Sequence, residues 1–316
     1  MTDQFEKDAG LAEQTAATLP GQEIPERAIL VSVPLPDEDE MDPDSSLNEL
    51  EELLKTAGGI SFGRMIQTRQ APDHATCIGR GKLAELAAVC RNVRIDLVVF
   101  DCELTPSQIR NIEDVLDGVR VIDRTMLILD IFARRATTAE GILQVAIANM
   151  KYTLPRLSGQ GKDLSRLGGG IGTRGPGESK LEIDRRRAKE KIRGLEKELE
   201  ELAKKRKTQR KSREKSGVFR ISLAGYTNAG KSTLLNALCE ESVLAENKLF
   251  ATLDPVTRRW KLGDSGEALL TDTVGFINRL PHHLVEAFRS TLDEVVYSDL
   301  ILVVLDASDP KFSQKL

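Results

Sequence analysis

The chain has 316 residues, of which 40% are hydrophobic and 30% charged, so it is long enough for more than one core and too apolar to be disordered throughout. Its four cysteines have no paired spacing, which favours buried thiols over a disulfide framework or a zinc site. The sequence contains no long apolar run and no basic, apolar leader, and we therefore expect a cytoplasmic protein without a membrane-spanning segment.

The net charge of −4 conceals a strong segregation of charge along the chain. Residues 1–60 contain 3 basic and 15 acidic residues, whereas residues 151–215 contain 21 basic and 10 acidic residues. A block as basic as the second is either the solvated face of a helix or a surface that binds nucleic acid. We interpret it as a nucleic-acid surface, because the positive charge is confined to one segment.

Residues 1–26 are acidic and polar and are predicted to form a disordered tail. Between residues 27 and 136, strand patterns alternate with helix patterns, which is typical of a small α/β domain with a largely parallel sheet. The predicted strands cover residues 28–33, 60–68, 97–100 and 119–122. The predicted helices cover residues 47–54, 82–90, 106–116 and 125–136, and Thr105 is the expected start of the third.

Residues 137–215 are predicted to form an antiparallel helical hairpin that links two domains. Apolar residues recur at steps of three and four over residues 143–157, and residues 181–202 contain one heptad stripe, so the two helices should pair along these stripes. The second helix is expected from Ser179 to about Arg210, which is roughly 45 Å at 1.5 Å per residue. The glycine-rich loop of residues 158–177 then lies at the tip, beside basic residues. The predicted RNA contacts are Arg156, Lys162, Arg166 and Arg174.

Two interpretations of this tip remain open. It is either a flexible linker or an RNA contact, and glycines that let the backbone approach a phosphate chain beside arginines favour RNA. Residues 170–175 also match the dinucleotide pattern G-x-G-x-x-G. We discount that match, because a predicted helix rather than a strand precedes it and Pro176 follows it.

The most specific motif is Gly225-Tyr-Thr-Asn-Ala-Gly-Lys-Ser232, which has the Walker A spacing. A strand pattern over residues 219–224 precedes it and a helix pattern follows it, which is the order that a phosphate-binding loop requires. In such a loop, backbone N–H groups surround the phosphates, the lysine reaches the outer phosphates and the serine hydroxyl binds Mg²⁺. The nucleotide-binding residues predicted in this segment are Asn228, Ala229, Gly230, Lys231, Ser232 and Thr233.

Two later segments complete the pattern of a switch GTPase. Thr252 lies in a stretch, residues 250–257, that is expected to be flexible and to close over the γ-phosphate, and an apolar segment ends in Asp272-Thr-Val-Gly275. We expect Asp272 and Gly275 to bind nucleotide, with Mg²⁺ held by Ser232, Thr252 and Asp272. The predicted catalytic residues are Lys231, Thr252 and Gly275. A P-loop kinase or ATPase is the weaker alternative, because Thr252 and the Asp272–Gly275 segment together favour a switch GTPase.

Seven further segments carry a family resemblance: Leu104–Asn111, Val121–Thr125, Leu129–Ala133, Leu154–Leu157, Gly168–Glu178, Asp184–Arg187 and Phe250–Pro255. On these segments the chain resembles the HflX-type GTPases over all but its acidic tail. The resemblance implies an N-terminal α/β domain, a helical linker and a P-loop GTPase domain. It also implies GTP and GDP as ligands, and association with the ribosome, chiefly with the large subunit and its RNA, in ribosome splitting or rescue under stress. We expect a monomer.

Two features depart from the family pattern. The Asn-Lys-x-Asp motif that recognises guanine is not reached by residue 316, so residues 216–316 are expected to form an incomplete GTPase domain. Phe276 stands where many GTPases have a glutamine that orients the attacking water, so the catalytic group should come from elsewhere. Asn228 suits a tight loop, and it also stands where potassium-dependent GTPases hold K⁺, which makes K⁺ a candidate cofactor. An RNA- or ribosome-binding module with little turnover is the alternative function.

Overall fold

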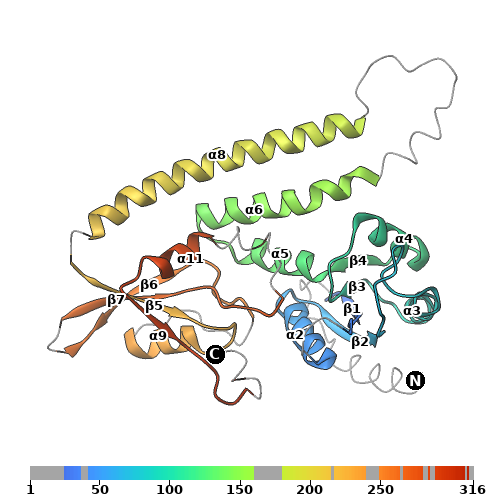
Figure 1. Ribbon diagram of the computed structural model, residues 1–316, viewed down its shortest axis with the longest axis horizontal. Coiled ribbons are helices and arrows are strands. Elements are labelled where there is room, and N and C mark those ends of the chain that lie inside the picture. Colours follow the sequence, from blue (N-terminus) through green and yellow to red (C-terminus); the bar gives the residue numbers. More distant parts are fainter. Residues whose placement is uncertain are drawn as a thin grey trace, which may run out of the picture. The chain divides into compact units, whose positions relative to one another are not determined.

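The computed structural model describes residues 25–36, 42–159, 180–214, 217–239, 249–263, 266–279, 284, 289–309 and 312 (Figure 1). The chain divides into two compact units, Met1–Asp130 and Ile131–Leu316. Each unit contains one four-stranded sheet among the described residues. This α/β architecture, with a parallel sheet first and a phosphate-binding-loop domain last, confirms the predicted fold class. The predicted acidic tail lies outside the described residues, apart from its last two positions.

The first unit is an entirely parallel sheet in the order β2-β1-β3-β4. The strands are β1 (Arg27–Ser32), β2 (Ile60–Ile66), β3 (Leu97–Phe100) and β4 (Arg120–Asp123). The helices are α2 (Pro43–Thr56), α3 (Arg80–Asn92), α4 (Pro106–Leu116) and α5 (Arg124–Arg135), of which the last leads into the second unit. All the predicted elements form, and α4 begins as expected in a capping box, in which Thr105 and Gln108 exchange hydrogen bonds.

The strand order changes direction between β1 and β3, a position where open α/β sheets commonly bind ligands. In this unit the chain's own side chains fill that edge. Asp101, which follows β3, accepts hydrogen bonds from Nη1 of Arg124 at 2.7 Å and from Oγ of Ser46 at 2.5 Å, and Arg124 also pairs with Glu49. Asp101 and Arg124 are each 3% exposed. Side chains of the first unit itself therefore occupy the position next to the end of β3 where such sheets commonly bind ligands.

Two of the four cysteines, which look scattered in the sequence, are neighbours in the structure. The Sγ atoms of Cys77 and Cys102 lie 3.4 Å apart, and both residues are free thiols. The hydrogen bond between them lowers the pKa of Cys77 and, together with burial, raises the pKa of Cys102. Burial alone raises the pKa of Cys90 to about 11. Cys77 and Cys90 are buried, as the sequence predicts, whereas Cys102 is partly exposed.

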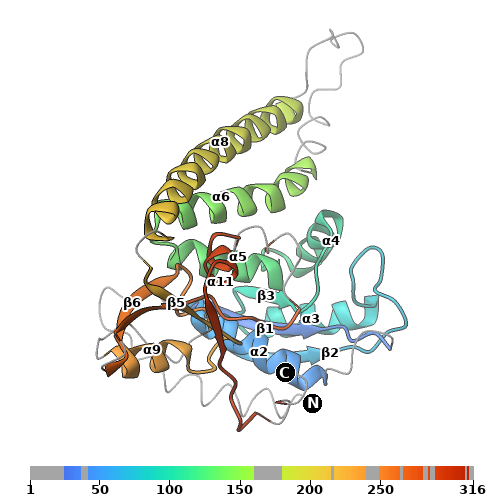
Figure 2. The same ribbon diagram turned by 60° about the vertical axis from the view of Figure 1, so that its left-hand side comes forward.

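The second unit begins with a helical hairpin. It consists of α6 (Ala139–Thr153), the 3-10 turn η1 (Leu154–Gly159) and α8 (Lys180–Glu214), and α6 and α8 lie side by side and antiparallel in Figures 1 and 2. Ile147 of α6 and Ile192 of α8 are both buried, as the apolar stripes predict, whereas Arg185 is exposed. Within the described residues, no helix has the length and apolar character needed to cross a membrane.

The rest of the second unit is a mixed sheet in the order β6-β7-β5-β8. Its elements are β5 (Phe219–Ala224), α9 (Lys231–Cys239), β6 (Val256–Lys261), β7 (Glu267–Asp272), α11 (Arg289–Val296) and β8 (Leu300–Val303). β5 runs parallel to β7 and β8, whereas β6 is antiparallel to β7. The sequence analysis missed β6, although Val256, Arg258 and Trp260 alternate with more exposed residues in the way a half-buried strand requires.

Candidate functional site

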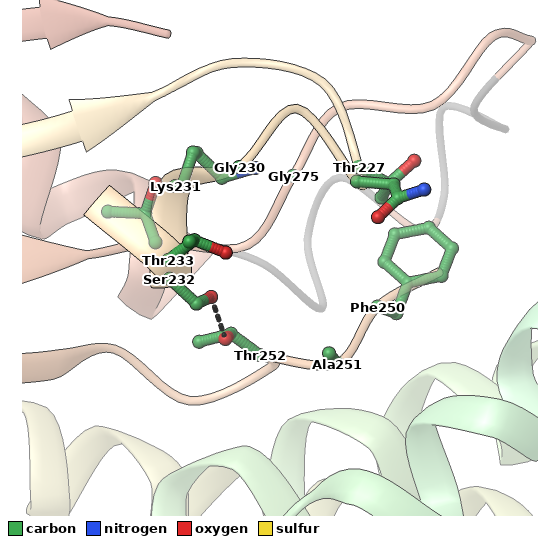
Figure 3. A pocket seen from close by; sticks show the side chains of 11 residues that line it. Thr227, Gly230, Lys231, Ser232, Thr233, Phe250, Ala251, Thr252 and Gly275 are labelled. Atoms are coloured by element: carbon green, nitrogen blue, oxygen red, sulfur yellow. Dashed lines mark hydrogen bonds between the residues drawn. The ribbon is translucent and has the colours of Figure 1, made fainter. Parts of the chain in front are cut away.

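The glycine loop of residues 225–230 joins β5 to α9 and forms one wall of a pocket (Figure 3). Asn228 and Gly230 adopt positive φ angles of 61° and 92°, so the chain turns through left-handed conformations that asparagine and glycine tolerate best. At Gly225 an added Cβ would lie 2.2 Å from the carbonyl oxygen of Val304, which excludes any side chain. Six predicted nucleotide-binding residues line the pocket: Asn228, Gly230, Lys231, Ser232, Thr233 and Gly275.

Lys231, the first residue of α9, is held inside this loop and is 6% exposed. Its Nζ donates hydrogen bonds to the carbonyl oxygens of Gly225 at 3.1 Å and Tyr226 at 2.7 Å. Burial lowers the pKa of Lys231, and the carboxylate of Asp272 opposes that shift. The ammonium therefore lies within the loop, where a loop of this type places the outer phosphates of a nucleotide.

Three oxygen-bearing side chains converge beside Lys231. The Oγ of Ser232 donates to Oδ2 of Asp272 at 2.6 Å, and the Oγ1 of Thr252 donates to the same oxygen at 3.0 Å. The two hydroxyls are 3.0 Å apart, as Figure 3 shows. Asp272 is fully buried, and its Oδ1 has no hydrogen-bond partner in the part of the chain that the structure describes. The structure thus brings together the three predicted metal ligands, although Ser232 and Asp272 are forty residues apart in the sequence.

This oxygen cluster fits Mg²⁺, which prefers hard oxygen ligands and keeps several waters. The buried, unpartnered Oδ1 of Asp272 is the kind of atom that a cation or its bound water would satisfy. No group of three His, Cys, Asp or Glu among the described residues is placed to hold a metal ion. A metal at Ser232, Thr252 and Asp272 would therefore draw its remaining ligands from phosphate oxygens and water.

The segment after β7 is fastened to the glycine loop. The backbone N–H of Thr227 donates to the carbonyl oxygen of Phe276 at 2.8 Å, and the N–H of Phe276 donates to the carbonyl oxygen of Gly225 at 3.0 Å. The ring of Phe276 packs edge-on against Tyr226, with centroids 6.2 Å apart, and the side chain is 44% exposed. Phe276 therefore offers no hydrogen-bonding side-chain group where many GTPases have a glutamine.

Side-chain contacts anchor the Thr252 loop, residues 249–255, near both ends, within the stretch of residues 250–257 that is predicted to be flexible. The ring of Phe250, which is 2% exposed, meets the ring of Phe132 edge-on at 4.8 Å. Asp254 accepts hydrogen bonds from the backbone and hydroxyl groups of Thr137 and Thr138. Burial raises the pKa of Asp254, but these hydrogen bonds outweigh it, so the pKa lies below its ordinary value. Sequence periodicity carried no signal for these contacts.

Only one of the predicted RNA contacts lies among the described residues. The guanidinium of Arg156 stacks on the ring of Tyr152, 3.7 Å from its centroid, and Nη1 donates to the carbonyl oxygen of Tyr152 at 2.8 Å. Lys162, Arg166 and Arg174 lie outside the described residues. The described part of α8 also exposes basic side chains that are not among the predicted RNA contacts. They include Arg185, Arg186, Arg187, Lys189, Lys191, Arg193, Lys197, Lys204 and Lys205.

Three family models match successive segments of the chain. Their descriptions are GTP-binding GTPase N-terminal (residues 44–133), GTP-binding GTPase Middle Region (residues 135–213) and 50S ribosome-binding GTPase (residues 220–316). The boundaries of the three matches follow the order of α/β unit, helical hairpin and phosphate-binding-loop domain.

Curated relatives that share the name GTPase HflX are similar to almost the whole chain. The relative from Caldanaerobacter subterraneus subsp. tengcongensis is 54% identical over 291 residues, covering 92% of this chain and 67% of its own length. The relative from Lacrimispora saccharolytica is 52% identical, covering 93% and 69%, and that from Escherichia coli is 44% identical, covering 92% and 67%. The chain thus spans about two thirds of the length of these relatives.

Among solved structures, the chain is similar to a GTP-binding protein from Sulfolobus solfataricus in complex with GDP. The identity is 25%, the TM-score is 0.48, and the match covers 92% of this chain and 74% of that one. A structure described as the complex of SsGBP and GDP matches at 25% identity with a TM-score of 0.49, covering 90% and 73%.

Proposed function

The chain belongs to the HflX family of GTPases, and from that membership we propose a cytoplasmic, Mg²⁺-dependent GTPase that acts on the large ribosomal subunit in ribosome splitting or rescue under stress. The convergence of Ser232 and Thr252 on Asp272, whose second oxygen is buried without a hydrogen-bond partner among the described residues, is the observation that supports the nucleotide site best. The basic hairpin and the family model described as a 50S ribosome-binding GTPase support the ribosome as partner.

In this proposal each residue of the site has one task. Lys231 and the N–H groups at the start of α9 bind the outer phosphates, because the ammonium and the helix N-terminus are both positive. Ser232, Thr252 and Asp272 would hold Mg²⁺, which, when bound, neutralises charge on the phosphate oxygens. The N–H of Gly275 is available to the γ-phosphate as its charge develops. Thr273 donates to the carbonyl oxygen of Leu223 at 2.6 Å and so fixes the strand end that presents Asp272.

Orientation of the attacking water needs a further group. Phe276 cannot hydrogen-bond water, and its ring is engaged with Tyr226. Asn228 lines the pocket in a left-handed conformation, and its side-chain oxygen is suited to a monovalent cation. We include K⁺ at Asn228 in the proposal, as a cation that supplies charge where the loop itself has no arginine.

The hairpin is the proposed RNA contact. Basic side chains are exposed along α8 from Arg185 to Lys205, and acidic side chains lie among them, such as Glu190, which pairs with Arg186 at 4.0 Å. Phosphate contacts of this kind are largely independent of sequence and suit structured RNA. A ribosome-binding module with little turnover is the second candidate, and the absence of a water-orienting side chain at Phe276 favours it.

Hydrolysis of GTP and of ATP by this chain, measured with and without purified large subunits, tests the proposal. We expect Mg²⁺-dependent GTP hydrolysis that large subunits accelerate, together with co-sedimentation of the chain and the subunit. Co-sedimentation without turnover in either condition would favour the binding module. Turnover that large subunits leave unchanged, with no co-sedimentation, would contradict the proposed partner.

A further inference from the structure

Thr137 and Thr138, the two residues before α6, hold the Thr252 loop through a single carboxylate, that of Asp254. The Oδ2 of Asp254 accepts hydrogen bonds from the N–H of Thr137 at 2.7 Å, the hydroxyl of Thr137 at 2.8 Å and the N–H of Thr138 at 2.9 Å. Its Oδ1 accepts from the hydroxyl of Thr138 at 2.5 Å. The same Thr138 oxygen accepts from the N–H of Gly141 at 3.0 Å and caps α6. Asp254 thus binds the positive end of the hairpin's first helix.

This contact fixes the place of Thr252. Asp254 is two residues further along the chain, and two residues span at most about 7 Å, so an anchor at Asp254 limits where Thr252 can lie. On the other side the rings of Phe250 and Phe132 form a second anchor. Between the two anchors the hydroxyl of Thr252 lies 3.0 Å from Oγ of Ser232 and 3.0 Å from Oδ2 of Asp272.

A second contact joins the first turn of α6 to helix α11. Arg206 of α8 pairs through Nη1 with Glu140 of α6 at 3.2 Å and through Nη2 with Asp293 of α11 at 3.0 Å. Helix α11 follows the segment that carries Asp272 and Gly275. The base of the hairpin therefore contacts the Thr252 loop through Asp254 and helix α11 through Arg206.

We propose that Asp254 is a positioning residue for GTP hydrolysis: by binding Thr137 and Thr138 it places Thr252 at the metal, and by the same contact it couples the nucleotide site to the helical hairpin. The proposal rests on the Mg²⁺–GTP site described above. Because coupling is reciprocal, a nucleotide that holds Thr252 at the metal favours this arrangement of loop and hairpin, and a partner that moves the base of the hairpin withdraws Thr252.

Two glycines of the hairpin give a matched test. A Cβ added at Gly141 would lie 2.4 Å from Oδ1 of Asp254, so the carboxylate must leave its place, whereas a Cβ added at Gly194 of α8 meets nothing within 4 Å. Alanine favours the helix at either position. We expect Gly141→Ala to lower kcat for GTP roughly tenfold or more, since small displacements of positioned groups have effects of that size. Both variants should bind GDP within about twofold of the parent, because the glycine loop and Lys231 are untouched.

Rescue at Thr138 provides a second comparison. Thr138→Val removes the hydroxyl that donates to Asp254 and caps α6, and it should slow turnover. Thr138→Ser keeps that hydroxyl and should restore the parental kcat. A role limited to stability would instead lower the unfolding temperature and the GDP affinity together with kcat. Asp114→Ala, an exposed aspartate of α4, is the control for loss of a carboxylate.

The double variant shows whether Asp254 acts through Thr252. If it does, Asp254→Ala combined with Thr252→Ala should be no slower than Thr252→Ala alone. Parental turnover of both Gly141→Ala and Asp254→Ala, or additive losses in the double variant, would overturn the inference while leaving the site intact. Parental turnover of Thr252→Ala would instead overturn the Mg²⁺–GTP site itself. The affinities of the same variants for β,γ-imido-GTP and for GDP, both measured in Mg²⁺, test the same comparisons without turnover. The ratio of the two affinities is the readout.

Discussion

Gly275 and Thr227 approach so closely that a Cβ on Gly275 would lie 2.6 Å from both the backbone N and the Cα of Thr227. The same Cβ would lie 2.8 Å from the Nζ of Lys231. Real side chains do not tolerate such contacts with backbone atoms, so the segment after β7 and the glycine loop fit together only without a side chain at position 275. The backbone hydrogen bonds between Phe276 and the loop maintain that fit.

Gly275→Ala should therefore disturb both the loop and Lys231. We expect a loss of about 100-fold in kcat/KM for GTP, since the loop N–H groups and Lys231 all move from their positions. Gly81→Ala is the control, because a Cβ there meets nothing within 4 Å. Steady-state hydrolysis by the two variants is the measurement, and parental activity in Gly275→Ala would show that the loop and the segment after β7 separate during turnover.

Lys231→Ala should weaken triphosphate binding while leaving the first unit folded. Hydrogen bonds to charged groups contribute about 1.5–3 kcal/mol, so we expect GTP affinity to fall roughly 10- to 150-fold and hydrolysis to become undetectable above background. Titration calorimetry and circular dichroism measure the two effects. Lys204→Ala, an exposed lysine of α8, should bind GTP like the parent. A Lys231→Ala protein that hydrolyses GTP at the parental rate would remove this lysine from the site.

Turnover should depend on the monovalent cation. Without a glutamine at position 276, hydrolysis by the isolated chain is expected to be slow, and K⁺ should accelerate it more than Na⁺ at equal ionic strength. Asn228→Ala should abolish the difference, because the proposed cation ligand is lost. Equal rates of the parent protein in the two salts would exclude K⁺ from the mechanism.

Ribosome binding should depend on salt and on the hairpin tip. If the basic segment contacts about five phosphates, log K should fall with log salt with a slope of roughly −3.5 to −4.5. Arg166→Glu with Arg174→Glu should weaken binding to large subunits and reduce the slope by about 1.4 to 1.8. Arg80→Glu with Arg91→Glu makes the same charge change at exposed positions of α3 and is the control. Equal affinity of the two double variants for large subunits would mean that Arg166 and Arg174 do not contact RNA and are only solvated.

Local signals in the sequence account for most of the fold. The bounds of β3 and α4 match the prediction, because a four-residue apolar run and a Thr105 capping box with Pro106 mark them unambiguously. The two helices of the hairpin followed from their apolar stripes. The antiparallel strand β6 was not predicted: its first two residues fell in the stretch expected to be flexible and the others were left unassigned, although its residues alternate between more and less buried positions.

In the candidate site too, the residues of a local motif were predicted from the sequence, whereas contacts between distant residues were not. Gly225, Lys231 and Ser232 belong to one short motif, and their arrangement follows from the order of strand, loop and helix. The hydrogen bonds between Asp254 and Thr138 join residues 116 positions apart, and no periodicity or local spacing encodes such a partner. The residue pattern placed the start of the hairpin at residue 137 but identified no helix cap there. It did not indicate that a carboxylate from another segment completes the cap.

Because α8 is long, a small rotation at its base would produce a large displacement at its opposite end. Its 35 residues span roughly 50 Å, and Arg206, which contacts α11, lies toward its C-terminal end. A pivot of about 10° at the base would carry the far end through roughly 9 Å on that arm, which is more than the width of a phosphate group. The hairpin is therefore long enough that a small rotation of its base on loss of the γ-phosphate would displace the far end of α8 by several times the length of the bond that was broken.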